Sequence, residues 1–212
     1  QGCEQPPQWH PEGDVFVHTR LMLSLLPEEA SLPLVLSTLF HDIGKPATFT
    51  YDEDAERIRF NGHDRLGAEM TKSILRRFKY SNEVVEAVTA AVAVHMQFKD
   101  VTKMRKATLK RFLARENFSD ELALHRADCL GSHGRLGYYE FLKEKIAEFA
   151  AEPLIPPPFV TGRDLIERGL APGPDFKRIL AAIQDQQLEG TLSSREEALE
   201  CLEQQIIASG ED

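Results

Sequence analysis

The stretch Phe40-His41-Asp42-Ile43-Gly44-Lys45-Pro46 constrains this chain more than any other part of its sequence. The apolar run from Leu32 to Phe40 predicts a helix, which leads directly into an imidazole and a carboxylate. We expect the helix to end here, because the glycine can adopt a positive φ and the proline cannot continue a helix. His41 and Asp42 are poorly suited to packing but well suited to metal ligation. The stretch therefore predicts part of a metal site.

Length and composition predict one sizeable globular domain with a small appendage. The 212 residues are 42% hydrophobic and 28% charged, which is ordinary for a globular protein. No apolar run reaches the ~20 residues that a membrane span requires, and the first residues are too polar for a signal peptide. Cys3, Cys129 and Cys201 are far apart and odd in number, which favours a reducing compartment. We therefore expect a cytoplasmic protein that does not contact a membrane.

Three regions are expected along the chain. Residues 1–13 are polar, lack an initiator methionine and predict a linker from an upstream region of a longer parent protein. Residues 14–152 predict the main domain. A proline-rich stretch then marks a boundary, and residues 153–212 predict a helical tail.

Helical periodicity dominates the chain after residue 13. Asp14, Asp64 and Ser81 are expected to be the N-caps of their helices. Residues 48–51 and 57–60 flank an acidic turn and predict one small β-hairpin. The predicted fold class is therefore all-α, with one hairpin insertion and a helical tail. The expected helices cover residues 14–26, 32–40, 64–75, 81–95, 108–115, 119–130, 138–149, 175–187 and 193–208.

Imidazoles and carboxylates recur on separate predicted elements, near an end or an apolar face. Neutral imidazole together with carboxylate suits Mn, Fe, Ni, Co or Zn and tolerates Mg. Burying so many of these groups without an ion would leave several costly unpaired atoms. We therefore predict one or two divalent metal ions and leave their identity open. The predicted ligands are His18, His41, Asp42, Asp128, His63 and His95.

Asp42 has two oxygens and could bridge two ions. One ion would be held from three helices, whereas His63 and His95 would hold the second. Two ions roughly 3.5–4 Å apart can activate a water for in-line attack on phosphorus. We therefore interpret Asp42 as both a ligand and a catalytic residue.

Three further residues are candidates for the chemistry around the ions. Lys45 and Lys99 would supply positive charge for a substrate phosphate, and Lys99 lies four residues after His95, on the same helix face. His125 lies three residues before Asp128 and would orient that carboxylate or act on the leaving group.

The segment from Lys99 to Arg115 holds seven positive residues against one negative residue, although the whole chain has a net charge of −9. It predicts either a solvated helix face or a phosphate-facing patch. The candidates for phosphate or RNA binding are Lys99, Lys103, Arg105, Lys106, Lys110 and Arg111.

Each of these candidates also has a purely structural interpretation. A single helical histidine such as His18 is most often a hydrogen-bonded residue of the core or its rim. Lys45 could meet the last carbonyls of its helix, and Asp128 could be a buried structural carboxylate. A second His-Asp dipeptide, His63-Asp64, shows that the dipeptide alone is a weak signal, and only its histidine is expected to bind metal.

The order of His18, His41-Asp42 and Asp128 resembles the signature of HD-domain metal-dependent phosphohydrolases. His63 and His95 resemble the extra ligands of the dinuclear members. Flanking motifs extend the resemblance to the C-terminal half of bacterial tRNA nucleotidyltransferases and poly(A) polymerases. These motifs are residues 9–19, 40–46, 125–130, 161–165 and 172–174.

The resemblance implies an HD-domain helical bundle and a phosphohydrolase that acts on nucleotide or RNA-end phosphates, such as a tRNA 3′ end. The implied activity is that of a 2′,3′-cyclic phosphodiesterase, 2′-nucleotidase or phosphatase. Nucleotide addition is not expected from this chain, because the Gly-Ser motif and paired aspartates of the transferase head have no counterpart in it. That head would belong to the longer parent.

Two alternatives stay open. The chain could be a tRNA-binding accessory part of a nucleotidyltransferase or poly(A) polymerase, with little turnover and a structural metal. It could also be a signalling hydrolase for alarmones or cyclic dinucleotides. The absence of a Gly-Tyr-Pro motif counts against the cyclic-dinucleotide version.

Overall fold

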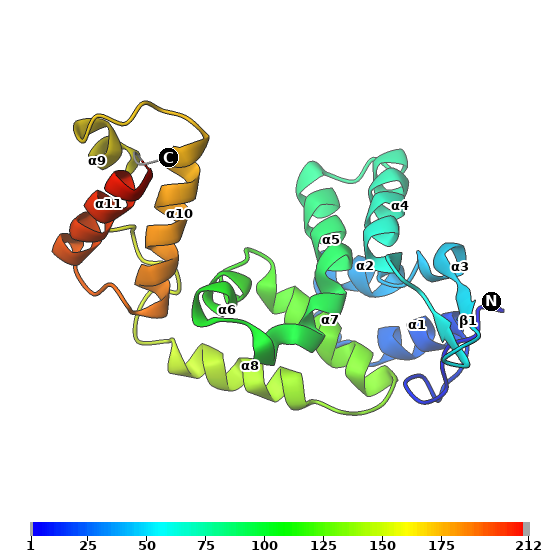
Figure 1. Ribbon diagram of the computed structural model, residues 1–212. Helices are drawn as coiled ribbons and strands as arrows, with labels where there is room; N and C mark the ends of the chain where they lie inside the picture. The colour runs from blue at the N-terminus through cyan, green and yellow to red at the C-terminus, as the bar shows by residue number, and fades with distance from the viewer. Residues whose placement is uncertain (1, 210–212) are drawn as a thin grey trace. The chain divides into compact units, whose positions relative to one another are not determined.

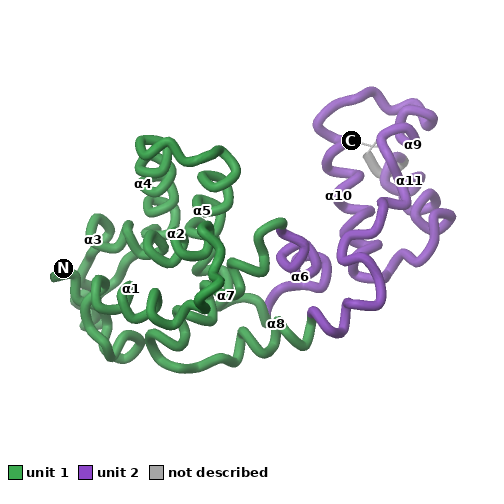
Figure 2. The backbone as a smooth tube through the Cα atoms, turned by 180° about the vertical axis from the view of Figure 1, so that it is seen from behind, with its two compact units in different colours: residues 1–102, 116–145 green, residues 103–115, 146–212 purple. Residues whose placement is uncertain are grey.

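The computed structural model describes residues 2–209 and divides the chain into two compact units (Figures 1 and 2). Unit 1 comprises the chain up to Thr102 together with Glu116–Lys145. Unit 2 comprises Lys103–Arg115 and the chain from Ile146 onward. The regular structure of the described residues is helical apart from one two-stranded hairpin, which confirms the predicted all-α class. The boundaries after residues 13 and 152 stay predictions.

Unit 1 contains most of the predicted helices and the hairpin. The predicted caps Asp14 and Ser81 are confirmed, because each side chain accepts a hydrogen bond from the backbone of its helix. The elements are α1 (Val15–Ser24), α2 (Leu32–Phe40), α3 (Lys45–Thr48), β1 (Thr50–Asp52), β2 (Arg57–Arg59), α4 (His63–Arg77), α5 (Asn82–Val94), the 3-10 helix η1 (His95–Lys103), α7 (Phe118–Gly131) and α8 (Gly137–Glu148), which continues into unit 2.

Two apolar clusters hold these helices together. One joins α2, α4 and α5, and the other joins α1, α2, α5 and α7, so α2 and α5 contribute to both. Each fully buried large side chain stabilises the fold by about 1.5–3 kcal/mol. Because α2 is central to both clusters, the residues at its C-terminal end are fixed in the middle of unit 1. The buried members are Leu36, Ala68, Leu75, Val85, Val88 and Val92 in the first cluster, and Met22, Leu34, Ala91, Leu124 and Ala127 in the second.

Two sequence expectations about turns are wrong. Asp64 does not cap α4, because Gly62 takes the cap position with φ 78° and Asp64 lies in the first turn of the helix. Gly44 has φ −78°, so a positive φ is not the reason why glycine is needed at this position. A Cβ at Gly44 would instead lie 2.3 Å from the backbone oxygen of His63. Glycine therefore lets the turn after α2 approach the start of α4, and Pro46 sits in the first turn of α3.

Unit 2 is a separate small helical body. It contains α6 (Lys106–Leu113), α9 (Gly162–Glu167), α10 (Pro174–Glu189) and α11 (Arg195–Ser209). Its core is formed by Val160, Leu165, Ile179, Ile183, Ala198 and Leu202. Among the described residues of both units, no helix combines the length and the apolarity that crossing a membrane requires.

A capping box explains the motif at residues 161–165. The backbone and the hydroxyl of Thr161 each donate to one oxygen of Asp164 at 2.7 Å, which starts α9. Arg195, the first residue of α11, forms an ion pair with the same carboxylate. The sequence alone did not predict α9, and Asp164 connects it to α11.

Replacing Gly44 by alanine is expected to destabilise the chain by about 1–3 kcal/mol, because the backbone of α4 cannot move aside as a flexible side chain could. Gly137→Ala is the matched control, since a Cβ there meets nothing within 4 Å. Urea unfolding measures both variants. Equal stability of the two would contradict the close approach of the turn to α4.

Asp164→Ala is expected to lower the free energy of unfolding by about 1–2 kcal/mol near neutral pH. Burial raises the pKa of Asp164, but the Thr161 hydrogen bonds and Arg195 outweigh burial and lower it from 3.8 to about 2. The ionised carboxylate is therefore favoured in the folded chain. Its contribution is complete above pH 4 and is lost as the pH falls towards 2.

Urea titrations at several pH values test this dependence. Asp175→Ala is the control, because Asp175 is an exposed carboxylate at the start of α10 that forms an ion pair with Arg178. A difference between Asp164→Ala and the parent chain that stays constant down to pH 2 would contradict the depressed pKa.

Candidate metal centre

All six predicted ligands lie at one place in unit 1, although they come from separate elements. The ends of helices supply most of them: α2 ends beside His41 and Asp42, α4 begins with His63, and η1 begins with His95 where α5 stops. The middle of α1 supplies His18 and the C-terminal part of α7 supplies Asp128. The four histidines and Asp42 are buried. The hydrophobic packing of the helices therefore gathers polar groups at their meeting point.

Asp42 lies between two groups of imidazoles. Its Oδ2 is 3.1 Å from Nε2 of His41, and its Oδ1 is 3.5 Å from Nε2 of His63 and 3.9 Å from Nε2 of His95. In the group of His18, His41 and Asp42, and in the group of Asp42, His63 and His95, the ligand atoms lie within 4.8 Å of one another. Asp42 belongs to both groups, as a bridging carboxylate would.

Backbone hydrogen bonds orient three of the rings. Nδ1 of His41, His63 and His95 lies 2.9, 2.7 and 2.7 Å from the carbonyl oxygen of the residue three positions earlier. A carbonyl only accepts, so Nδ1 carries a proton in each ring, and in the neutral rings of His63 and His95 the lone pair is on Nε2. Nε2 of His63 and Nε2 of His95 are 3.1 Å apart. Two lone pairs at that distance repel each other unless a cation lies between them.

The residues fit a divalent cation. Nε2 of His18 and Nε2 of His41 are buried, and each lies 3.1 Å from a carboxylate oxygen, of Asp128 and of Asp42 respectively, without a well-aligned hydrogen bond. Coordination of an ion by these nitrogens and by the two carboxylates would give all four groups a partner. Imidazole and carboxylate donors are the set that first-row transition metals accept.

The carboxylates are held in the charged state. Burial raises the pKa of Asp42, but His41 and Lys45 outweigh burial and hold the pKa well below its usual value. Burial also raises the pKa of Asp128, and the imidazoles of His18 and His41 outweigh it. Both groups are therefore available as anionic ligands.

Burial keeps two of the imidazoles neutral. It lowers the pKa of His63 and, together with the nearby His41, lowers the pKa of His95 to about 4. For His41, burial lowers the pKa but the adjacent Asp42 outweighs it and raises the pKa. A bound cation would replace the proton on His41, so metal binding at this site would release protons.

Asp128 is placed differently from Asp42. Its Oδ1 is 3.1 Å from Nε2 of His18, but it belongs to neither group of three. Its side chain is 29% exposed, whereas that of Asp42 is 3% exposed. Asp128 therefore lies at the edge of the cluster, where the cluster meets a cavity.

The predicted catalytic residues Lys45 and His125 lie beside the cluster. Nζ of Lys45 is 2.7 Å from Asp42 Oδ2 and donates to Gln5 Oε1 at 2.6 Å, so its charge is fixed next to the bridging carboxylate. His125 stacks on Phe98 with ring centroids 4.5 Å apart, and burial lowers its pKa to about 4. His125 is therefore neutral at physiological pH.

The structure divides the basic segment between the two units. Lys99 is exposed and lines the cavity beside the cluster. The other candidates belong to unit 2, where several already have local partners: Arg105 and Arg111 pair with Asp185. Lys110 lies over the ring of Phe149. Lys103 and Lys106 also lie in unit 2. The six candidates are therefore divided, with Lys99 in unit 1 and the other five in unit 2.

Sequence reasoning missed the residues that support His18. Glu12 Oε1 lies 2.6 Å from Nδ1 of His18 and 2.9 Å from Nδ1 of His10. A carboxylate on Nδ1 fixes the ring so that Nε2 faces the cluster, and it makes the imidazole a stronger ligand. Gly13, with φ 91°, turns the chain between Glu12 and α1. The available signal was the acidic residue six positions before His18 within the motif at residues 9–19.

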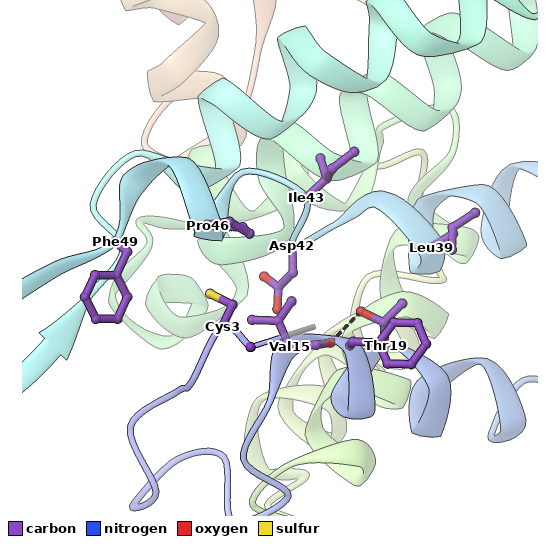
Figure 3. A pocket seen from close by; sticks show the side chains of 10 residues that line it. Cys3, Val15, Thr19, Leu39, Asp42, Ile43, Pro46 and Phe49 are labelled. Carbon is purple, nitrogen blue, oxygen red and sulfur yellow. Dashed lines mark hydrogen bonds between the residues drawn. The ribbon is translucent and has the colours of Figure 1, made fainter.

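Two cavities border Asp42. One, of about 780 Å³, is lined by Asp42, His63, His95, Asp128 and several cationic side chains. The other, of about 550 Å³, is shown in Figure 3 and is lined mainly by apolar side chains together with Cys3 and Thr19. None of its lining residues carries a positive charge. The larger cavity is therefore the one suited to an anionic substrate.

Comparisons with known proteins agree with this geometry. The profile of the family described as HD domain matches residues 15–132, more than half of the chain. The chain is 34% identical over 198 residues to the A-adding tRNA nucleotidyltransferase of Deinococcus radiodurans, covering 87% of this chain and 45% of that protein. It is also 34% identical over 206 residues to the CC-adding tRNA nucleotidyltransferase of Thermus thermophilus, covering 93% of this chain and 44% of that protein.

A third relative is the multifunctional CCA protein of Cupriavidus metallidurans. It is 30% identical over 145 residues, which cover 65% of this chain and 33% of that protein. The chain thus spans less than half the length of each of these relatives.

Glu12→Gln is expected to weaken metal binding about 10- to 100-fold while the fold is retained, because the amide orients His18 less strictly and removes a charge. Calorimetric titration with Mn²⁺ measures the affinity. Glu4→Gln is the matched control, since Glu4 lies in the same segment and is exposed. An unchanged affinity in Glu12→Gln would contradict the support given to His18.

Proposed function

Because the chain belongs to the HD-domain family, we propose that unit 1 is a divalent-metal-dependent phosphohydrolase that acts on nucleotide or RNA-end phosphates. The observation that carries the proposal is the position of Asp42 between two groups of imidazoles whose Nε2 atoms face one another. The expected activity is that of a 2′,3′-cyclic phosphodiesterase, 2′-nucleotidase or phosphatase.

The proposed ligands are the six residues predicted from the sequence: His18, His41, Asp42, His63, His95 and Asp128. When bound there, divalent ions would lower the pKa of a water and polarise a phosphoryl oxygen. The site would hold one or two such ions, and its donors serve Mn, Fe, Ni, Co, Zn and Mg.

The chain's own residues supply the remaining electrostatics. Asp42 remains ionised because His41 and Lys45 hold its pKa down. Lys45 is fixed by Asp42 and Gln5 and places a positive charge beside the reacting phosphate. Lys99 lines the cavity and would attract the phosphate on entry. His125, being neutral, would hydrogen-bond to the leaving group.

The similarity to tRNA nucleotidyltransferases extends the proposal to the substrate. We propose that the substrate includes the 3′ end of tRNA, that a longer parent carries a nucleotidyltransferase region upstream, and that the protein acts in the cytoplasm. Unit 2 would then be a helical body that contacts RNA through Lys103, Arg105, Lys106, Lys110 and Arg111.

The alternative is an RNA-binding accessory module with little turnover. The similarity to tRNA nucleotidyltransferases over most of the chain favours it. The pairing of Arg105 and Arg111 with Asp185 counts against it, because paired charges contribute less to phosphate binding.

The substitution Asp42→Asn tests the proposal. Asp64→Asn is the matched control, because it makes the same change in the second His-Asp dipeptide. We expect Asp42→Asn to lose at least about 100-fold in turnover, since losing even an outer partner of a ligand costs 10- to 100-fold. Asp64→Asn should keep its activity. The assay uses 2′,3′-cyclic AMP, 2′-AMP, 3′-AMP and a bis-aryl phosphate with Mn²⁺, Ni²⁺, Co²⁺ and Mg²⁺, and chelation should abolish turnover.

Full activity of Asp42→Asn would overturn the metal mechanism. An inactive parent chain that binds tRNA, and loses that binding on charge reversal of Lys103, Arg105 and Lys106, would establish the accessory module instead.

A further inference from the structure

The larger cavity of unit 1 contains more than the metal cluster needs. Besides the ligands, its walls include the aromatic residues Trp9, Phe60 and Tyr138. They also include three exposed cations, Arg57, Lys99 and Arg135. Hydrolysis of a bare phosphate would require neither the aromatic rings nor charges beyond Lys45. The additional groups indicate that the cavity receives a larger ligand.

A closed loop brings Trp9 into this wall. Glu4 and Asp14 form a β-bridge, and the backbone N–H of Cys3 donates to the Asp14 carboxylate at 2.8 Å, so the two ends of the loop meet. The loop is also attached to the cluster at two points, through Gln5 on Lys45 and Glu12 on His18. Trp9 is therefore held in place by the same contacts that orient the metal ligands.

Trp9 is partly exposed beside this cavity. The residue is 48% exposed, and its ring contact among the described residues is edge-on with His133, at 6.4 Å between centroids and 77°. Tyr138 is 40% exposed in the same cavity. One exposed aromatic residue is ordinary on a protein surface. Two beside a charged cavity match the arrangement on which nucleobases stack.

Two of the three cations have no carboxylate partner. No ion pair joins Lys99 or Arg135 to another residue in the described part of the chain, although the chain is acidic as a whole. The arginines of β2 differ from them, because Arg57 lies opposite Asp52 in the hairpin and Arg59 forms an ion pair with it. Unpaired positive charges on a cavity wall favour an anionic ligand that extends beyond the cluster.

We infer that this cavity binds one nucleoside phosphate, free or at an RNA end, with its base stacked on Trp9 and its phosphate beside the proposed metal ligands that line the cavity. The position of the phosphate rests on the proposed function. The position of the base rests on Trp9 and Tyr138 alone. A volume of about 780 Å³ suits such a ligand, since small-molecule sites measure about 300–1,000 Å³.

Trp9 is the sole tryptophan of the sequence, so its fluorescence reports on the base directly. With Mg²⁺ present, we expect 2′-AMP to quench the fluorescence and ribose 5-phosphate, which lacks a base, to leave it unchanged. Equal responses to the two ligands, or no response to either, would overturn the inference.

Substitution of Trp9 gives a second, independent measurement. Trp9→Ala should weaken 2′-AMP binding about 5- to 150-fold in calorimetric titrations, and Trp9→Phe should restore most of it. Binding of ribose 5-phosphate should stay the same in both variants. Phe78→Ala is the control, because Phe78 is 65% exposed and does not line the cavity. Equal losses for 2′-AMP and ribose 5-phosphate in Trp9→Ala would overturn the stacking role.

A short RNA with a 2′,3′-cyclic phosphate end separates the two sources of the ligand. If its binding also depends on Trp9, and is tighter than that of the free nucleotide, the site is for an RNA end. If only the free nucleotide depends on Trp9, the site is for a nucleotide.

These outcomes are distinguishable from those of the hydrolase proposal. Base-dependent quenching without any turnover would contradict the hydrolase proposal and support the base site. Turnover of 2′-AMP with the same KM in Trp9→Ala and the parent chain would contradict the base site and support the hydrolase proposal.

Discussion

The buried carboxylate of Asp42 is the constraint on which the rest of unit 1 depends. Burying a lone charge is so costly that such groups are found paired or bound to metal. Asp42 has the Lys45 ammonium on one oxygen and the imidazoles of His63 and His95 near the other. These imidazoles present lone pairs rather than protons, so they do not compensate the charge by themselves. A cation would satisfy the carboxylate and the lone pairs together.

The fold holds this arrangement through backbone features rather than through the ligands alone. The last turns of α2 and α5 and the loop before α4 supply the carbonyl groups that fix three Nδ1 protons, and Gly44 lets the start of α4 approach the end of α2. The loop before α1 adds Glu12 behind His18 and Gln5 behind Lys45. Each of the four histidines is thus oriented from behind by a second group. Such support keeps a metal site rigid before the ion binds.

Local patterns in the sequence predicted much of this. The apolar run at 32–40 matches α2 residue for residue, because helix propensity, Ser31 as cap and burial all agree there. The predicted ligands meet at one place because each is at an element end or a buried face. The features that the sequence could not indicate depend on how the chain packs. They are the close approach of Gly44 to the backbone of His63, the position of Gly62 as the cap of α4, and the contact of Glu12 with His18. A count of charges along the sequence likewise cannot show that the basic segment is divided between two units.

The surroundings of the cluster bear on the choice between a structural and a reactive metal. A structural ion is usually enclosed by protein ligands, whereas a reactive one keeps a position open to water or substrate. Asp42, His63, His95 and Asp128 line a cavity of about 780 Å³, and the side chain of Asp128 is 29% exposed at that border. A cluster built only for stability would gain nothing from an opening whose wall carries the exposed cations Lys99 and Arg135. The opening therefore favours hydrolysis over a purely structural role.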